Sequence, residues 1–383
     1  MRRPIARRTA AAATLALLVG LTVIGPDARP GTVVSVRRHT PDANYAANTR
    51  YAKVEPGHPV RFPADFGSHP AYRIEWWYLT GWLKTRRGAP LGVQITFFRN
   101  RPDIWRGNPS AFTPRQLLIA HCALADPQHG RLWRAQRIER AGFGLAGAGI
   151  GDTDVWVGRW RLVRNGGVYR GRCAGRDFSV DLSFTATQPP LLNGVDGYSR
   201  KSADPRSASE YYSIPQLRVA GRITRDGRAE PVTGAAWLDH EWSSAYLARG
   251  AVGWDWIGIN LEDGGALMAF RIRGKNGLTR WAGGTVRSAD GRVQILSPAD
   301  VRFTPLRQWV SPRTAIRYPI EWRVRAGRRI LRLRPLLDDQ ENDARASSGT
   351  IYWEGAVRAF DEHRLVGHGY LELTGYGTPL RLR

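Results

Sequence analysis

The sequence predicts an all-β protein. Its 383 residues include 42 glycines, 24 prolines and 15 tryptophans, a composition that suits many turns and aromatic strand positions. Short runs of alternating apolar and polar residues recur along the chain, as expected for strands with one buried face. After residue 30, no long stretch repeats its apolar residues with helical spacing. A chain of this length is long enough for two domains of ordinary size.

The first half of the chain reads as a series of strands separated by turns. The strongest strand runs from Tyr72 to Leu83, after a turn at 65–70, and the others are expected at 92–99, 117–126, 155–163, 168–173, 178–185 and 216–224. Turn pairs such as Asn165-Gly166 separate them. Between 189 and 217 the chain is rich in Gly, Ser, Pro and Asp, which predicts a long irregular loop. Loops of this length are either lids over a functional site or flexible connections.

The second half continues the alternation from a central stretch, Ala235–Asn260. Two strands are expected there, at 237–242 and 254–261, joined by a short link that contains Gly250 and Gly253. Later strands are predicted at 266–273, 279–287, 293–296, 318–325, 330–335, 351–360 and 368–376.

The first thirty residues are predicted to direct export across the cytoplasmic membrane. Arg2, Arg3, Arg7 and Arg8 precede an uncharged apolar run at 10–25. This run is shorter than the roughly 20 residues of a membrane-spanning helix, so it favours a secretory signal, with an uncleaved anchor as the alternative. Either the general secretory route or the twin-arginine route is compatible with these residues. Residues 31–60 are polar and are interpreted as a linker.

The net charge of +24 does not predict nucleic-acid binding. The arginines are scattered rather than gathered into a stripe, and no signature of a nucleic-acid-binding module is present. A basic surface favours instead association with an anionic membrane surface or with cell-wall polymers.

Two cysteines, Cys122 and Cys173, leave two interpretations open. An exported protein permits a disulfide between them. Alternatively, Cys122 is a buried free thiol in its apolar run.

The central stretch concentrates the side chains that could carry chemistry. Asp239, His240, Glu241 and Asp255 lie among Trp237, Trp242, Trp254 and Trp256. In a strand, His240 and Trp242 share one face, and Asp239 and Glu241 share the other. Asp255 shares its face with Ile257 and Ile259. A carboxyl group on an apolar face is either paired or held with a raised pKa, and a raised pKa suits a proton donor at neutral pH.

Two further residues could be functional or structural. Glu75 points to the same side of its strand as Trp77 and Leu79, and its structural interpretation is an ion pair with an arginine inside a barrel. His121 lies in an apolar run and is interpreted as a core histidine, because no partners at metal-ligand spacing accompany it.

Six motifs resemble, in order, those of the AttH/CrtC family, which includes carotenoid 1,2-hydratases. They are found at 62–83, 196–217, 234–244, 253–258, 352–357 and 369–376. The resemblance implies two tandem lipocalin-like β-barrel domains, placed at 61–230 and 231–383, and an apolar cavity for one ligand. It also implies that Asp239, His240, Trp242 and Asp255 serve catalysis, in which a carbon–carbon double bond is protonated and then adds water.

The expected chemistry assigns one role to each group. Asp255 is the predicted proton donor, tryptophan faces stabilise the developing cation, and His240 positions or deprotonates water. The substrate-lining residues are expected to be Glu75, Trp76, Trp77, Tyr78, Tyr212, Glu241, Trp254 and Trp256. No cofactor and no metal are expected, and the substrate is expected to be a hydrophobic polyene or lipid.

The alternative to an enzyme is a carrier. A lipocalin-like barrel could bind a lipid or pigment outside the membrane, linked to an ABC-type transport system, and the acids of the central stretch would then be tied to arginines of neighbouring strands. Hydrolysis is disfavoured because the sequence contains no G-x-S-x-G nucleophile motif.

Overall fold

A computed structural model describes residues 51–102 and 108–380. The chain divides into two units, Met1–Tyr45 and Ala46–Arg383, and every described residue belongs to the second. The predicted export segment, 1–30, and most of the predicted linker lie outside the described residues. Within the described ranges there is no helix of the length and apolar character that crossing a membrane requires.

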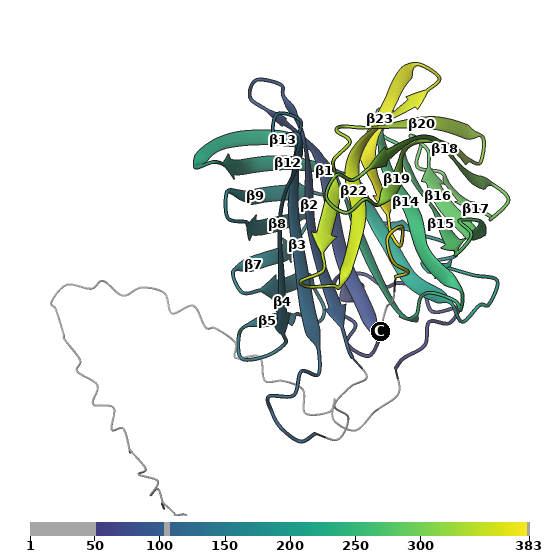
Figure 1. Ribbon diagram of the computed structural model, residues 1–383. Helices are drawn as coiled ribbons and strands as arrows, with labels where there is room; N and C mark the ends of the chain where they lie inside the picture. The colour runs from purple at the N-terminus through teal and green to yellow at the C-terminus, as the bar shows by residue number, and fades with distance from the viewer. Residues whose placement is uncertain (1–50, 103–107, 381–383) are drawn as a thin grey trace, which may run out of the picture. The chain divides into compact units, whose positions relative to one another are not determined.

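The all-β prediction is confirmed: the described strands form two antiparallel sheets (Figure 1). The first sheet has the order β4-β3-β2-β1-β13-β12-β9-β8-β7-β6-β5 and curls into a nearly closed, lipocalin-like barrel. Its main strands are β1 (Ile74–Thr85), β2 (Pro90–Asn100), β3 (Leu117–Asp126), β4 (Arg131–Arg140), β5 (Ala146–Ala148), β6 (Asp154–Val157), β7 (Trp160–Asn165), β8 (Val168–Ala174), β9 (Phe178–Thr185), β12 (Ala208–Arg225) and β13 (Arg228–Ala245). Two short strands, β10 (Leu191–Leu192) and β11 (Tyr198–Arg200), pair with β12.

The second sheet has the order β17-β16-β15-β14-β23-β22-β20-β19-β18. Its strands are β14 (Ala251–Leu261), β15 (Ala266–Gly274), β16 (Thr279–Arg287), β17 (Val293–Leu296), β18 (Val301–Val310), β19 (Arg317–Ala326), β20 (Arg329–Pro335), β21 (Glu341–Ala344), β22 (Thr350–Asp361) and β23 (Arg364–Leu373), with β21 paired to β22. The described helical element is a short 3-10 turn, Ala64–Phe66, before β1.

Two features differ from the sequence prediction. The strand that carries Asp239 and His240, β13, is hydrogen-bonded between β1 and β12 of the first sheet. The chain therefore passes from the first sheet to the second between Ala245 and Ala251, not at residue 230. In addition, the strand expected from residue 216 already begins at Ala208, so the end of the predicted irregular loop is regular and buried.

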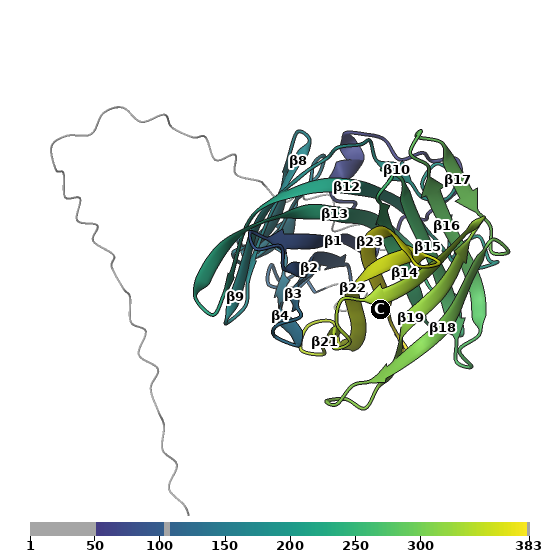
Figure 2. The same ribbon diagram turned by 90° about the horizontal axis from the view of Figure 1, so that it is seen from above.

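Alternating positions on these strands supply the three largest apolar clusters of the described residues. One cluster, with Trp77 and Trp242, fills the interior of the first sheet, and a second, with Ile257 and Trp322, fills that of the second sheet. The third joins residues of both sheets and includes Tyr78 and several other aromatic side chains. There Trp82 on β1 donates a hydrogen bond from Nε1 to the Gly369 carbonyl on β23, 2.9 Å away, and Figure 2 shows these two strands side by side.

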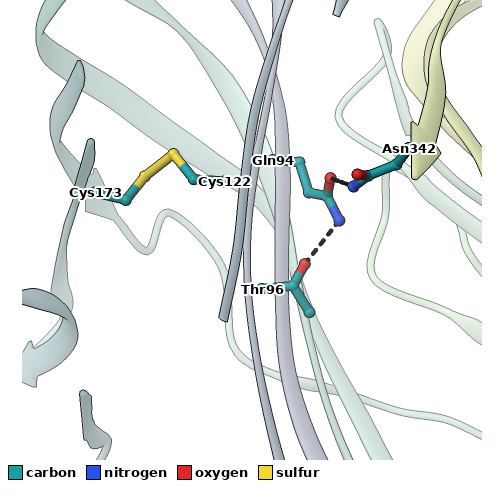
Figure 3. Close-up of a disulfide and its surroundings, with 5 residues drawn as sticks. All are labelled: Gln94, Thr96, Cys122, Cys173 and Asn342. Carbon is teal, nitrogen blue, oxygen red and sulfur yellow. Dashed lines mark hydrogen bonds between the residues drawn. A yellow bond between two sulfur atoms is a disulfide. The ribbon is translucent and has the colours of Figure 1, made fainter. Parts of the chain in front are cut away.

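Cys122 and Cys173 form a disulfide, which resolves the alternative left open by the sequence. The bond links β3 to β8, strands that are not neighbours in the order of the first sheet. Figure 3 shows the disulfide on one side of β2 and β3, and Gln94 on the other side, where it reaches Asn342 of the second sheet. The two cysteines are therefore interior residues of the first sheet.

Replacing both cysteines by serine is expected to lower the free energy of unfolding by about 2 to 4 kcal/mol. The closed loop has a sequence separation of 51 residues, so losing the crosslink gives the unfolded chain considerable conformational freedom. Urea denaturation with and without a reducing agent measures the effect. Equal midpoints for the reduced and oxidised wild-type protein would contradict it.

Candidate functional site

Strand β13 sends its chemically active side chains to two different places. Tyr78 lies opposite Asp239 in the register with β1, and Trp77 lies opposite His240. Because neighbouring residues of a strand point to opposite faces, Asp239 and Glu241 join the cluster between the sheets, whereas His240 and Trp242 enter the first-sheet interior. This division follows the two faces that the sequence predicts.

The face with Asp239 opens into a pocket of about 70 Å³, which we call the inter-sheet pocket. It is lined by Trp76, Tyr78, Phe98, Tyr211, Asp239, Glu241, Tyr246, Trp254, Trp256 and Glu372. Six of these residues are predicted site residues, and they come from β1, β13 and β14. Larger pockets, of about 440 and 860 Å³, are lined by several arginines and contain none of the predicted site residues.

Asp239 is a buried acid among aromatic rings. Its Oδ1 accepts hydrogen bonds from Ser213 Oγ at 2.5 Å and Trp237 Nε1 at 2.6 Å. Burial raises the pKa of Asp239 to about 8, against the opposing effect of these hydrogen bonds. Asp239 is thus held mainly as a neutral carboxylic acid at pH 7, the state that a proton donor needs.

Glu241 is next to Asp239 on the same face and is held by a buried lysine. Lys201 Nζ lies 2.8 Å from Glu241 Oε1, and Ser209 Oγ donates to the same oxygen. Burial raises the pKa of Glu241 and lowers that of Lys201, while their mutual attraction opposes both shifts. The ammonium group also lies about 5 Å from the rings of Tyr211 and Tyr246, so aromatic faces help to solvate it.

Two glutamates of the second sheet complete the polar side of this region. Glu354 on β22 and Glu372 on β23 are paired in register. Burial raises the pKa of Glu372 to about 7, although Trp254 Nε1 donates to it at 2.8 Å. Burial, with the charge of Glu372 beside it, places the pKa of Glu354 well above its usual range. The sequence reasoning missed both, although each glutamate lies in an otherwise apolar run, the same signal that singled out Asp255.

The second group of predicted residues forms a hydrogen-bonded chain inside the first sheet. Glu75 Oε1 lies 2.9 Å from His240 Nε2, and His240 Nδ1 lies 2.9 Å from the Tyr212 hydroxyl. Arg99 Nε donates to Glu75 Oε2 at 2.7 Å, so Glu75 has the arginine partner of its structural interpretation. Trp77 stacks on the His240 ring.

Burial, neighbouring charges and hydrogen bonds have opposing effects on the pKa values of this hydrogen-bonded group of side chains. Burial lowers the pKa of His240 to about 4, which keeps the imidazole neutral. Burial alone would raise the pKa of Glu75, but the charge of Arg99 and hydrogen bonds from two histidines hold it well below its usual range. The second histidine is His69, which the sequence reasoning did not single out.

Asp255 lies in neither group. It is on the face of β14 with Ile257 and Ile259, as predicted, and this face packs into the second-sheet interior. Its oxygens accept hydrogen bonds from Arg271 Nε at 2.5 Å and Arg273 Nε at 3.0 Å, and from the Tyr376 hydroxyl. The structure therefore does not bring the predicted donor together with His240 or Asp239, and Asp255 has the arginine partners that the carrier interpretation expects.

His121 is a core histidine, as expected. Its ring nitrogens lie 2.7 Å from the Tyr352 hydroxyl and 3.0 Å from Ser347 Oγ. Burial lowers its pKa to about 3, so it is neutral.

Comparison with known proteins finds a matching family model and solved structures with this architecture. A family model described as AttH-like matches residues 53–376. The crystal structure of a candidate AttH protein from Nitrosomonas europaea is 50% identical, with a TM-score of 0.81 over 85% of this chain and 99% of that one. Kievitone hydratase from Nectria haematococca is 15% identical, with a TM-score of 0.65 over 86% and 97% of the two chains, and at this identity it shows a shared fold. No curated protein matches the chain.

Proposed function

The chain belongs to the AttH-like family, and from this premise we propose that it is a hydratase-like enzyme. The reaction is the acid-catalysed addition of water to a carbon–carbon double bond in an apolar substrate. We place it in the inter-sheet pocket, with Asp239 as the proton donor in place of Asp255.

One observation carries the proposal: a carboxyl group with a pKa raised to about 8 faces a pocket in which seven of the ten lining residues are aromatic. Protonating an alkene requires an acid that keeps its proton at neutral pH until the substrate takes it. It also requires surroundings that stabilise a carbocation without attacking it. Aromatic faces do this through their ring quadrupoles, by about 0.5 to 2 kcal/mol each.

The reaction balances with the groups present. Asp239 gives its proton to one alkene carbon, and the positive charge develops on the neighbouring, more substituted carbon. Trp254 and Trp256 line the same pocket as Asp239, and in this proposal their rings stabilise the charge. A water molecule adds to the cation and loses a proton to the Asp239 carboxylate, which restores the acid.

The size of the pocket restricts the substrate. Its volume of about 70 Å³ is less than the roughly 150 Å³ of an engineered apolar cavity that binds benzene. Only the end of a long molecule would enter, which favours an acyclic chain with a terminal branched alkene, such as an isopropylidene group. The rest of the substrate would lie outside the pocket.

The same aromatic lining would also suit a carrier that binds an apolar ligand without chemistry. We further propose that either activity takes place beyond the cytoplasmic membrane, on the basis of the export segment predicted at 1–30. There the ligand would be a lipid, polyene or pigment, supplied from the membrane surface or by an ABC-type transport system.

An experiment in D₂O separates the enzyme from the carrier. Acyclic polyenes with a terminal isopropylidene group, squalene first, are incubated with the protein in D₂O and analysed by mass spectrometry. The enzyme is expected to give a tertiary alcohol with one carbon-bound deuterium next to the new carbinol carbon, because the added proton comes from the exchangeable acid. A polyene that quenches tryptophan fluorescence by binding but is recovered unchanged would contradict the hydratase and support the carrier.

A further inference from the structure

A second potential site lies inside the first sheet, on the face of β13 opposite Asp239. His69 Nδ1 lies 2.8 Å from Glu75 Oε1, and His240 Nε2 lies 2.9 Å from the same oxygen. The ligand atoms of these three residues lie within 4.8 Å of one another. We propose that His69, Glu75 and His240 bind a divalent transition-metal ion, with Zn²⁺ as the best match.

The donor set is that of known zinc sites. Two histidines and one glutamate supply three ligands and leave a fourth position for water or another ligand. Zinc bonds to imidazole nitrogen and carboxylate oxygen measure about 2.0 to 2.2 Å, so each histidine nitrogen would have to move away from Glu75 Oε1 by a few tenths of an ångström to make room for an ion. Without a metal, the two histidines instead share hydrogen bonds with Glu75.

The strongest support is that each ligand is already oriented by a second partner. The remote nitrogen of His69, Nε2, lies 3.2 Å from Asp65 Oδ1, and that of His240, Nδ1, lies 2.9 Å from the Tyr212 hydroxyl. Metal-binding histidines are usually held in this way, by a carboxylate or another polar group on the nitrogen that does not bind the metal. Arg99 donates to the second oxygen of Glu75, and the first oxygen accepts from the His69 backbone N–H and faces both imidazoles.

The surrounding rings fix the imidazole planes. His69 stacks on Trp242 with ring centroids 3.6 Å apart, and His240 stacks on Trp77 at 4.7 Å. Both nitrogens that face Glu75 are therefore held in place, which lowers the entropy lost when a metal binds.

The charges also leave room for a cation. Glu75 and Asp65 are carboxylates of this group, and Glu210, opposite Trp242 in the pairing of β12 and β13, interacts electrostatically with both Asp65 and His69. Glu210 Oε2 is buried and has no hydrogen-bond partner. A cation bound between His69, Glu75 and His240 would therefore lie beside these carboxyl groups, with Arg99 already paired to Glu75.

The test measures metal binding by the full-length protein, independently of any turnover. The protein is stripped with a chelator and titrated with Co²⁺, and then with Zn²⁺ as a competitor. We expect one equivalent of Co²⁺ to give visible d–d absorption that Zn²⁺ displaces. His69→Ala, at the partly exposed ligand, should abolish this signal, and Asp65→Asn should weaken binding by about 10- to 100-fold by freeing His69.

A matched control is His121→Gln, which replaces a buried histidine that is not part of this group. It should bind one equivalent of Co²⁺ as the wild type does. Circular dichroism checks the fold of each variant, and Asp65→Asn tests the proposal even if His69→Ala does not fold. Folded wild-type protein that binds no Co²⁺, or binding that is unchanged in both Asp65→Asn and His69→Ala, would overturn the metal site and leave the inter-sheet pocket unaffected.

Discussion

Replacing Asp239 by asparagine is expected to reduce hydration by about 10²- to 10⁴-fold while the protein stays folded. Asparagine keeps the shape of the side chain and can accept the hydrogen bonds from Ser213 and Trp237, but it has no proton to give. Binding of the polyene, followed by tryptophan fluorescence, should change little. Equal initial rates for the variant and the wild type would exclude Asp239 as the donor.

The same variant should become more stable than the wild type as the pH rises. Because the pKa of Asp239 in the folded state is about 8, above its usual value of 3.8, its contribution to stability is complete below pH 3.8 and is lost as the pH rises through 8. Asparagine stays neutral and avoids this loss, which is on the order of a few kcal/mol. Urea denaturation at pH 5 and pH 9 measures the difference. A stability difference independent of pH would contradict the raised pKa.

Replacing Asp255 by asparagine is expected to destabilise the protein by about 3 to 5 kcal/mol without affecting turnover per folded molecule. The substitution leaves Arg271 and Arg273, both largely buried, without their carboxylate partner in the second-sheet interior. Thermal unfolding measures the stability, and the initial hydration rate divided by the concentration of folded protein measures the turnover.

The matched control for Asp255 is Asp154→Asn, which breaks a solvent-exposed pair with Arg161 and should cost less than about 1 kcal/mol. A stable Asp255→Asn protein that has lost turnover would return the role of proton donor to Asp255.

Much of the site could be predicted from strand periodicity. The alternation of apolar and polar residues separates the faces of Asp239 and His240, and it places Asp255 with Ile257 and Ile259, as the structure has them. Periodicity describes one strand at a time, however, and does not tell which strands face one another. Asp255 pairs with Arg271 and Arg273 on β15. Nothing in the sequence distinguishes these two arginines from the many others.

The functional residues that the sequence does not predict were missed for the same reason: periodicity does not show which segments meet in space. The sequence predicts Tyr212 as a lining residue but not its neighbour Tyr211, and only the pairing of β12 with β13 puts Tyr211 opposite Glu241, where it lines the pocket. Lys201 looks like an ordinary polar loop residue, and its burial depends on contacts with Glu241 from a different strand. His69 precedes β1 in an irregular segment, to which no periodicity applies.

The central claim, that Asp239 is a neutral acid at physiological pH, is tested most directly by infrared spectroscopy. The difference spectrum between the wild type and Asp239→Asn isolates the carbonyl stretch of this one protonated carboxyl group from those of Glu354 and Glu372. The structure predicts that this band is present at pH 7 and disappears with a midpoint near pH 8. A carboxylate signal at pH 7, with a midpoint near pH 4, would contradict the account.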